Sequence, residues 1–312
     1  MGERKILTMK ILNFGSLNLD YIFRVPHFVT PGETLSADSL AVFPGGKGLN
    51  QSIALARAGA CVFHGGCYGE GGEPLVSLLA ENGVNVSLLE KADAVQGSAM
   101  ICVAPDGANT IVLSAGSNAC VTEEQVAAAL EGFEEGDWLL LQNEINNPER
   151  LIEKAYEKGM KIILNPSPFN EKLEAADFSK LAWLIVNDTE AQQVSGKTDP
   201  DEVFEIIHQQ YPALSLVLTL GEEGSIAWQV QDQEITVCHQ DAFPVQAVDT
   251  TGAGDTFTGY FVQALMAGMP LETCMKRAAA AAALSVTKSS AAASIPSRQE
   301  VEAFLEKNGG RV

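Results

Sequence analysis

The sequence has 312 residues, of which 46% are hydrophobic and 19% charged, and its formal net charge is −20 at pH 7. This length suits one large α/β domain or two modest ones, and so acidic a surface disfavours nucleic acid and anionic membranes as partners. The first 15 residues contain no long apolar region or cleavage site, and no run of 18 apolar residues follows, so we expect a cytoplasmic protein.

Short apolar segments alternate with segments of helical periodicity along most of the chain. The apolar segments are residues 10–16, 61–66, 137–144, 161–168, 182–188 and 214–221. Helices are expected over 50–60, after a capping box at Thr122–Gln125, and over 147–159, 190–196 and 201–211. Continuous apolar runs suit strands buried on both faces, so the alternation predicts a doubly wound, mostly parallel α/β sheet with helices on both faces.

Two regions depart from this alternation. Residues 16–45 are extended and rich in turns, and residues 97–113 are typical of two short strands joined by the turn PDGAN. No linker-like change in composition accompanies them. We therefore expect a single domain over residues 1–312, in which these segments form a small β-sheet that serves as a lid or a dimer contact.

The stretch DTTGAGDTF, residues 249–257, places small residues where a helical pattern begins. Gly252, Ala253 and Gly254 would expose backbone N–H groups at the positive end of the helix macrodipole, which suits an anion. Asp255 is then either the N-cap of this helix or a base beside an anion hole. The small residues favour the base, because an N-cap does not need them.

A second glycine-rich helix start, FPGGKGLNQ, covers residues 43–51. Its Lys47 and Asn50, with Asn18 and Asp20 from the earlier NLD, offer ammonium, amide and carboxylate groups. This mixture of donors and acceptors suits a ligand with several hydroxyls. A tight turn with a surface lysine, and a turn role for Asp20, remain alternatives from these residues alone.

Other cofactor and metal motifs are incomplete. The GKT at residues 196–198 lacks the first glycine of a P-loop because Ala191 occupies that position, and Gly196 is better explained as a helix end. No GxGxxG follows the first apolar segment, which disfavours classical nicotinamide binding. The six cysteines are scattered without a CxxC pair, so we expect reduced thiols rather than zinc ligands.

The stretches GGKGLNQ (45–51) and DTTGAGDTFTGYF (249–261) resemble the two signatures of the ribokinase-like (PfkB) family of carbohydrate kinases. Supporting stretches are NLD (18–20), LLLQNE (139–144), LNPSP (164–168), VNDTE (186–190) and TLGEEG (219–224). They follow the family's order over roughly residues 9–306, and the spacing from NLD to GGKGLN favours the ribokinase branch. The resemblance implies the ribokinase-like fold, ATP as phosphate donor and a sugar as acceptor.

In this family the aspartate of GAGD takes the proton from the sugar hydroxyl, and the amides before it stabilise the transferred phosphoryl group. The resemblance therefore implies that Asp255, Gly252, Ala253 and Gly254 are catalytic. The implied sugar site comprises Asn18, Asp20, Gly46, Lys47, Asn50, Ala99, Ile111, Glu144 and Asp255. The residues alone leave Glu144 open as an ordinary strand end.

The implied nucleotide site comprises Asn187, Thr219, Gly221, Gly224, Gly254 and Ala279, while Glu222 and Glu223 are interpreted as solvated charges. Asn187 and Glu190 would hold Mg²⁺ largely through water, although the same residues also fit a capped helix start. A monovalent cation, K⁺, would lie near Asp249, Thr251, Ser285, Lys288, Ser290 and Ser294, several of them acting through backbone carbonyls. The chain departs from the family at KSSAAAS (288–294), where a Gly-Ala pair is common, and at Ala279, where Asn or His is common.

D-Ribose, converted to ribose 5-phosphate, is the substrate that the resemblance favours, and deoxyribose, fructose or a nucleoside are alternatives. A nucleoside would need aromatic lid residues, for which Phe23, Phe28 and Phe43 are candidates. A phosphorylated substrate would need extra arginines, and only Arg24 and Arg57 lie near in sequence. A non-catalytic sugar-binding protein is disfavoured by the intact Asp255 and N-x-x-E motif. The resemblance also implies a homodimer formed through the lid strands.

Overall fold

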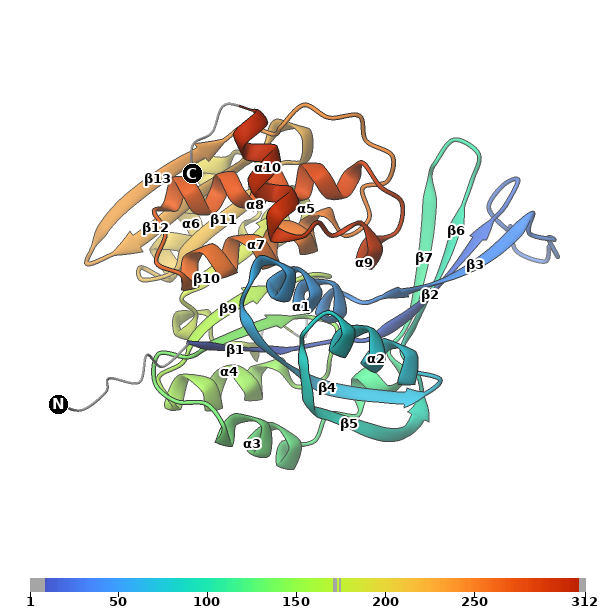
Figure 1. The fold of residues 1–312 in the computed structure, drawn as a ribbon, viewed down its shortest axis with the longest axis horizontal. Coiled ribbons are helices and arrows are strands. Elements are labelled where there is room, and N and C mark those ends of the chain that lie inside the picture. The colour runs from blue at the N-terminus through green and yellow to red at the C-terminus, as the bar shows by residue number, and fades with distance from the viewer. Residues whose placement is uncertain (1–8, 171–172, 174, 309–312) are drawn as a thin grey trace.

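The computed structural model describes residues 9–170, 173 and 175–308, so part of the amino-terminal stretch considered above lies outside the described residues. A nine-stranded sheet forms the centre, in the order β13-β12-β11-β10-β9-β8-β1-β4-β5 (Figure 1). Its parallel strands are β1 (Lys10–Phe14), β4 (Cys61–Glu70), β5 (Asn85–Val95), β8 (Trp138–Gln142), β9 (Lys161–Asn165), β10 (Trp183–Asn187) and β11 (Ser215–Thr219). The predicted mostly parallel sheet is confirmed. The sequence did not reveal β5 or the antiparallel pair β12 (Ser225–Gln231) and β13 (Glu234–Gln240).

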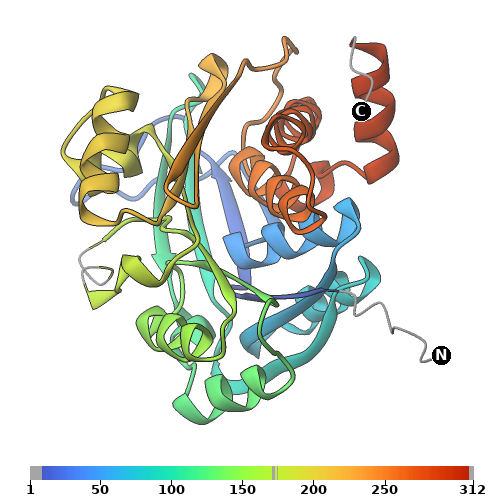
Figure 2. The ribbon, with the colours of Figure 1, turned by 90° about the vertical axis from the view of Figure 1, so that its left-hand side faces the viewer.

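Helices cover both faces of this sheet, as predicted (Figure 2). One layer contains α1 (Lys47–Ala58), α2 (Glu73–Glu81), α7 (Ala253–Met266), α8 (Leu271–Val286) and α10 (Arg298–Lys307). The other contains α3 (Glu123–Glu131), α4 (Pro148–Glu157), α5 (Asp188–Ser195) and α6 (Pro200–Gln210). Successive residues of a strand face opposite layers, so Ile11 of β1 joins the first core and Leu12 the second. Among the described residues, no helix combines the length and apolar content needed to cross a membrane.

The described chain also contains shorter helical segments, among them η1 (Gly116–Ala119), η3 (Phe178–Lys180), η4 (Gly221–Glu223) and α9 (Ala291–Ser294). The predicted capping box at α3 is only half formed. The Thr122 side chain accepts from the Gln125 N–H, but the Gln125 amide instead donates to the Gly66 carbonyl at 2.7 Å. This difference arises because Gln125 is buried against β4.

The second sheet has four strands in the order β3-β2-β6-β7 and extends to one side of the main sheet (Figure 1). These strands are β2 (Asn18–Arg24), β3 (Ser39–Gly45), β6 (Ser98–Val103) and β7 (Asn109–Ser114). The predicted separate small sheet is confirmed, and β2 and β6 pair in parallel while the outer pairs are antiparallel. We call this sheet the lid.

The close packing of α1 against α7 determines where the two glycine-rich helix starts meet. A Cβ atom added to Gly259 of α7 would lie 2.4 Å from the Ala54 Cβ of α1, so any larger residue would push these helices apart. Parallel strands also deliver their carboxyl ends to one edge of the sheet, where ligands of open α/β sheets usually bind. The starts of α1, α5 and α7 therefore converge on the ends of β8 to β11.

Candidate active site

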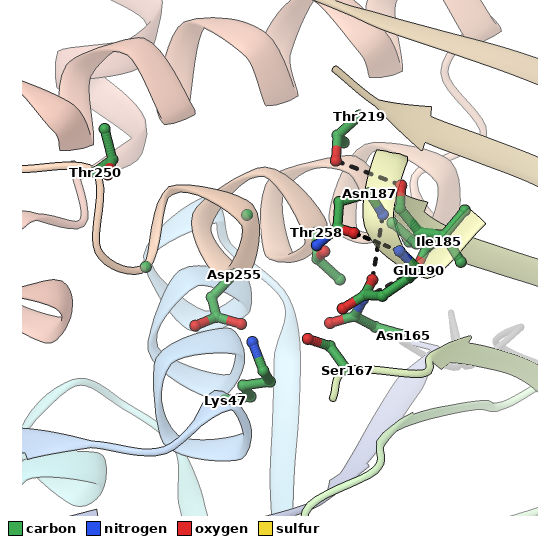
Figure 3. A pocket seen from close by; sticks show the side chains of 13 residues that line it. Lys47, Asn165, Ser167, Ile185, Asn187, Glu190, Thr219, Thr250, Asp255 and Thr258 are labelled. Atoms are coloured by element: carbon green, nitrogen blue, oxygen red, sulfur yellow. Dashed lines mark hydrogen bonds between the residues drawn. The ribbon is translucent and has the colours of Figure 1, made fainter. Parts of the chain in front are cut away.

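A pocket of about 240 Å³ lies at this edge of the main sheet (Figure 3). It is lined by the starts of α1, α5 and α7 and by the ends of β9, β10 and β11. The lining residues are Lys47, Asn165, Ser167, Ile185, Val186, Asn187, Glu190, Thr219, Thr250, Gly252, Gly254, Asp255 and Thr258. Residues from both glycine-rich stretches and from the N-x-x-E motif thus meet in one cavity.

Asp255 lies in the first turn of α7, and its carboxylate is held from two sides by α1. The N-cap of α7 is Gly252, with φ of 76°, so the interpretation of Asp255 as N-cap is wrong. Its Oδ2 accepts from Asn50 Nδ2 and its Oδ1 from Gln51 Nε2, both at 2.9 Å. Figure 3 shows the carboxylate turned toward the Lys47 ammonium. Asp255 is 7% exposed, and its carboxylate is fixed in position at the wall of the pocket.

The small residues before Asp255 border the pocket unequally. Gly252 and Gly254 line it, and a Cβ atom on Gly254 would meet no atom within 4 Å, so the space beside this backbone is open. The Ala253 N–H instead donates to the Thr250 carbonyl at 3.2 Å. An anion could therefore approach the start of α7 at Gly252 and Gly254, whereas the Ala253 amide is already engaged.

Lys47 is the first residue of α1, following Gly46 with φ of 93°. Its side chain points into the pocket, so the alternative of a surface lysine does not hold. Burial alone would lower the pKa of Lys47, but the carboxylates of Asp255, Glu144 and Glu190 outweigh it and leave the pKa raised. The pocket therefore contains a stable cation that suits a phosphate group.

Glu144 follows β8 and joins the start of α1 to the end of β1. Its Oε2 accepts from the Lys47 backbone N–H at 2.9 Å and from the Ser16 hydroxyl. Burial raises its pKa, and Lys47 and Ser16 only partly oppose this effect. Glu144 is thus an anchored side chain rather than an ordinary solvated strand end.

Asp20 extends from the lid toward the same carboxylates. A Cβ atom on Gly45 would lie 2.0 Å from Asp20 Oδ2, so only glycine lets this carboxylate lie across the β3 backbone. Burial, followed by repulsion from Glu144 and Asp255, raises the pKa of Asp20 to about 6. Asp20 therefore interacts electrostatically with Glu144 and Asp255 of the predicted sugar site. It lies within β2, so the alternative of a turn residue is wrong.

The remaining predicted sugar contacts differ in how deeply their side chains are buried. Asn18 is buried, and its Oδ1 accepts from Asn118 Nδ2 at 2.7 Å. Ala99 is in register with Asp20 and buried, whereas Ile111 lies farther out on the lid and is 54% exposed. Ile111 is therefore not packed into the site within one chain.

Asn187 and Glu190 form a complete capping box at the start of α5. Asn187 Oδ1 accepts from the Glu190 N–H at 2.8 Å, and Glu190 Oε2 accepts from the Asn187 N–H at 3.2 Å. The capped helix start is confirmed, and both residues also line the pocket. These bonds engage the single side-chain oxygen of Asn187 and one of the two oxygens of Glu190, so the pair fits Mg²⁺ held through water rather than bound directly. Within the described residues, no group of three or more His, Cys, Asp or Glu side chains is arranged to hold a metal.

The predicted nucleotide residues continue outward from Asn187. Thr219 ends β11, lines the pocket and donates to the Val186 carbonyl at 3.4 Å. Gly221 and Gly224 flank the following turn with φ of 60° and 96°. Ala279 lies in α8 and is buried in the core cluster of that layer.

The predicted cation residues lie around two loops that Asp249 joins. Its Oδ1 accepts from the Thr251 N–H at 2.9 Å and its Oδ2 from the Ser290 N–H at 3.0 Å. Burial opposes ionisation, but these bonds, with a contribution from Arg24, lower the pKa of Asp249. Ser290 has φ of 77°, so the KSSAAAS loop adopts a left-handed conformation without glycine.

The other side chains of this predicted cation group are directed elsewhere. The hydroxyls of Ser285 and Ser294 donate to carbonyls of their own helices, and Lys288 Nζ bonds Glu300 at 3.0 Å. A cation at these loops would therefore be held by backbone carbonyls.

Several pocket residues were not singled out from the sequence. Asn165, Ser167, Thr250 and Thr258 line the pocket, and Gln51 holds Asp255 directly. A signal was present for Asn165, because a polar residue that ends a fully apolar parallel strand lies at the ligand-binding edge. Gln51 ends the signature GGKGLNQ, but the resemblance gave it no role, and a glutamine near the start of a helix is also compatible with an exposed position.

Comparisons with known proteins agree with this geometry. The sequence profile described as pfkB family carbohydrate kinase matches residues 8–298. The chain is 35% identical to the ribokinase of Haemophilus influenzae, over 97% of this chain and 99% of that protein, and 30% identical to the deoxyribokinase of Salmonella typhi, over 96% and 100%. It superposes with a TM-score of 0.82 on the ribokinase of Arabidopsis thaliana complexed with ribose and ATP, at 26% identity over 96% of this chain and 99% of that one. The chain belongs to the pfkB family of carbohydrate kinases.

Proposed function

We propose that this carbohydrate kinase transfers the γ-phosphate of ATP to D-ribose, giving ribose 5-phosphate. The observation that carries the proposal is the Asp255 carboxylate, fixed by Asn50 and Gln51 and facing Lys47 across the pocket. The relatives named ribokinase, and the structure with ribose and ATP, support the choice of sugar and phosphate donor.

In this proposal each group has a distinct task. Asp255 takes the proton from the attacking hydroxyl, while the amides at Gly252 and Gly254 and the Lys47 ammonium face the phosphoryl group. The sugar hydroxyls bind Asn18, Asp20 and Glu144. Asn50 also borders that site, but its Nδ2 already holds Asp255.

The nucleotide would run from Asn187 along Thr219, Gly221 and Gly224 toward Ala279 of α8. Asn187 and Glu190 would hold Mg²⁺ through water, and Mg²⁺ would neutralise charge on the phosphates. K⁺ would be bound by carbonyls around Asp249 and Ser290, close to the start of α7.

Among the alternatives, deoxyribose is supported by the similarity to a deoxyribokinase. For a nucleoside, Phe43 is in register with Asp20 and shares its lid face, whereas Phe23 lies on the opposite face. For a phosphorylated substrate, Arg57 is unsuited, because it bonds Asn82 and the carbonyl of Ile295.

ADP release measured with a panel of pentoses, hexoses and nucleosides, each with and without K⁺, tests the function. We expect the highest kcat/KM with D-ribose and faster turnover with K⁺. If no compound raises ADP release above background, the proposal of a kinase acting on any of these substrates fails. A clear preference for deoxyribose, fructose or a nucleoside would replace ribose.

We further propose that residues 1–312 act as a single cytoplasmic domain that pairs with a second copy through the lid. Apolar side chains on the lid are solvent-exposed in the single chain, among them Leu40, Met100, Ile111, Val112 and Leu113. Exposed apolar strands favour a partner. The free state of all six cysteines suits a reducing compartment. Sedimentation equilibrium measures the assembly directly, and a monomer at micromolar concentration would contradict it.

A further inference from the structure

We propose that Gln51 is a positioning residue for the carboxylate of Asp255, and that Gln142 and Asn165 lock the Gln51 amide in the orientation this task requires. The inference rests on the proposed role of Asp255 as the base. It concerns residues from α1, β8 and β9 that lie within the family-like stretches GGKGLNQ, LLLQNE and LNPSP, but to which the resemblance assigned no role.

The contacts form one buried chain behind the pocket. Gln51 Nε2 donates to Asp255 Oδ1 and to Asn165 Oδ1, each at 2.9 Å. Gln142 Nε2 donates to Gln51 Oε1 at 2.6 Å and to Asn13 Oδ1 at 2.8 Å. Asn13, Gln51 and Gln142 are all fully buried, so water does not compete for these bonds.

The donors and acceptors allow only one orientation of the Gln51 amide. An ionised carboxylate accepts only, so the side that faces Asp255 must be Nε2. Asn165 Nδ2 donates to the Ile185 carbonyl at 2.9 Å, which turns its Oδ1 toward Gln51. A flipped Gln51 would place its oxygen against two acceptors and its nitrogen against a donor.

The far branch of the chain fixes Gln142 in the same way. Asn13 Nδ2 donates to Ser52 Oγ at 2.7 Å and to the Gly48 carbonyl, so its Oδ1 is the atom that accepts from Gln142. His64 Nε2 contacts the Gly15 carbonyl, so it carries the proton, and Nδ1 accepts from Ser52 at 2.7 Å. Burial lowers the pKa of His64 to about 4, so this branch stays neutral in the assay range.

One atom of Gln142 destabilises the fold, and no hydrogen bond of the network compensates for it there. Its Oε1 is buried without a partner among the described residues. A buried unpaired oxygen is destabilising, and such groups persist where the remaining bonds serve another purpose. For Gln142 the remaining bonds are the two that its Nε2 donates, and one of these fixes the Gln51 amide.

The orientation has a geometric consequence for Asp255. Asn50 holds one oxygen of its carboxylate and Gln51 holds the other, each at 2.9 Å. Loss of the Gln51 donor would leave the carboxylate held at one oxygen only. It could then rotate away from the position in which it meets the attacking hydroxyl.

The test compares Gln51→Met and Gln51→Glu with Gln125→Met, which changes a buried glutamine of α3 outside this buried chain of bonds and is the matched control. For Gln51→Met we expect kcat to fall by about 100-fold, the effect of roughly 1 Å of misplacement, with the sugar KM little changed. Gln51→Glu should be at least as slow, because it places a carboxylate oxygen against the acceptors Asp255 and Asn165. Gln125→Met should lower the melting temperature and leave kcat and KM in place.

A purely structural role for Gln51 predicts that both variants lose melting temperature, as Gln125→Met does, and keep the kcat of the unmodified enzyme once folded; that result overturns the inference. If neither variant folds, the unmodified enzyme decides by NMR. The Gln51 side-chain amide protons should exchange slowly, and their shifts should change in Asp255→Asn; rapid exchange or unchanged shifts contradict the inference. Failure of the base assignment looks different, since Asp255→Asn would then turn over normally.

Discussion

The edge of the main sheet and the lid hold the two halves of the site in opposite ways. Behind Asp255, polar side chains from α1, β1 and β8 are fully buried and mutually bonded, as Asn13 and Gln51 show. On the lid, apolar side chains such as Met100 and Val112 are 53% and 67% exposed. The contrast teaches that the half around Asp255 is assembled within one chain, whereas the lid leaves an apolar face uncovered in the single chain.

The largest effect should come from the assembled half. Asp255→Asn removes the base and should reduce turnover by about 10³-fold or more, while sugar binding persists. Coupled ADP release and calorimetric titration with ribose measure the two properties. Asp201→Asn, an exposed acid-to-amide change in the first turn of α6, is the control. Turnover within tenfold of the unmodified enzyme would remove Asp255 from the role of base.

Lys47→Met should have the next largest effect, because it removes the ammonium that faces Asp255. We expect turnover to fall by about 100-fold, the typical effect of losing one group that stabilises transition-state charge. Initial rates at saturating ATP and sugar measure it. Lys91→Met provides the comparison, since that lysine is exposed and pairs with the exposed Glu73. Equal rates in the two variants would mean that the pocket ammonium does not act on the phosphoryl group.

A charge introduced on the exposed apolar face of the lid tests the other half of the site. Val112→Asp should dissociate the proposed dimer and raise the sugar KM by about tenfold, with a smaller change in kcat, because buried apolar area and not chemistry is lost. Light scattering and steady-state kinetics follow both. Asn109→Asp adds a charge at an exposed polar position of the same strand and should leave the assembly intact. Unchanged mass and KM in Val112→Asp would show that this face needs no partner.

The smallest effect concerns Asp20, where the two halves meet. Its pKa is raised to about 6, so the folded protein disfavours the ionised form. Well below pH 3.8 the group is protonated in both folded and unfolded states, and above about 6 it is ionised in both and destabilises the fold. Asp20→Asn should therefore increase the unfolding free energy at pH 8, by at most about 3 kcal/mol, and by much less at pH 4.

Thermal melts across this pH range measure the effect, and Asp38→Asn, at an exposed lid carboxylate, is the control. A gain of equal size at pH 4 and pH 8 would mean that burial of the charge is not its cause. Sugar binding should weaken at both values in the Asp20 variant.

The parallel strands and most helices were predictable, because their apolar periodicity reflects burial between two layers. The antiparallel β13 was not, since five of its seven residues are exposed and apolar periodicity is weak there. The pocket was predictable where glycine or a charge marks the chain, as at Gly254 and Lys47. Gln51 and Gln142 were not, because their roles depend on partners 204 and 91 residues away in the chain.

The paired bonds of Asn187 and Glu190 couple the folding of one short helix to the lining of the pocket. The same two side chains close the first turn of α5 and border the cavity beside Asp255. A truncation such as Asn187→Ala would thus fray the helix and alter the pocket together, and its activity could not be ascribed to either. Glu190→Gln retains an oxygen for the Asn187 N–H and removes only the charge. Replacing a single atom, rather than removing a whole side chain, therefore separates the stability of the helix from the chemistry of the pocket at this position.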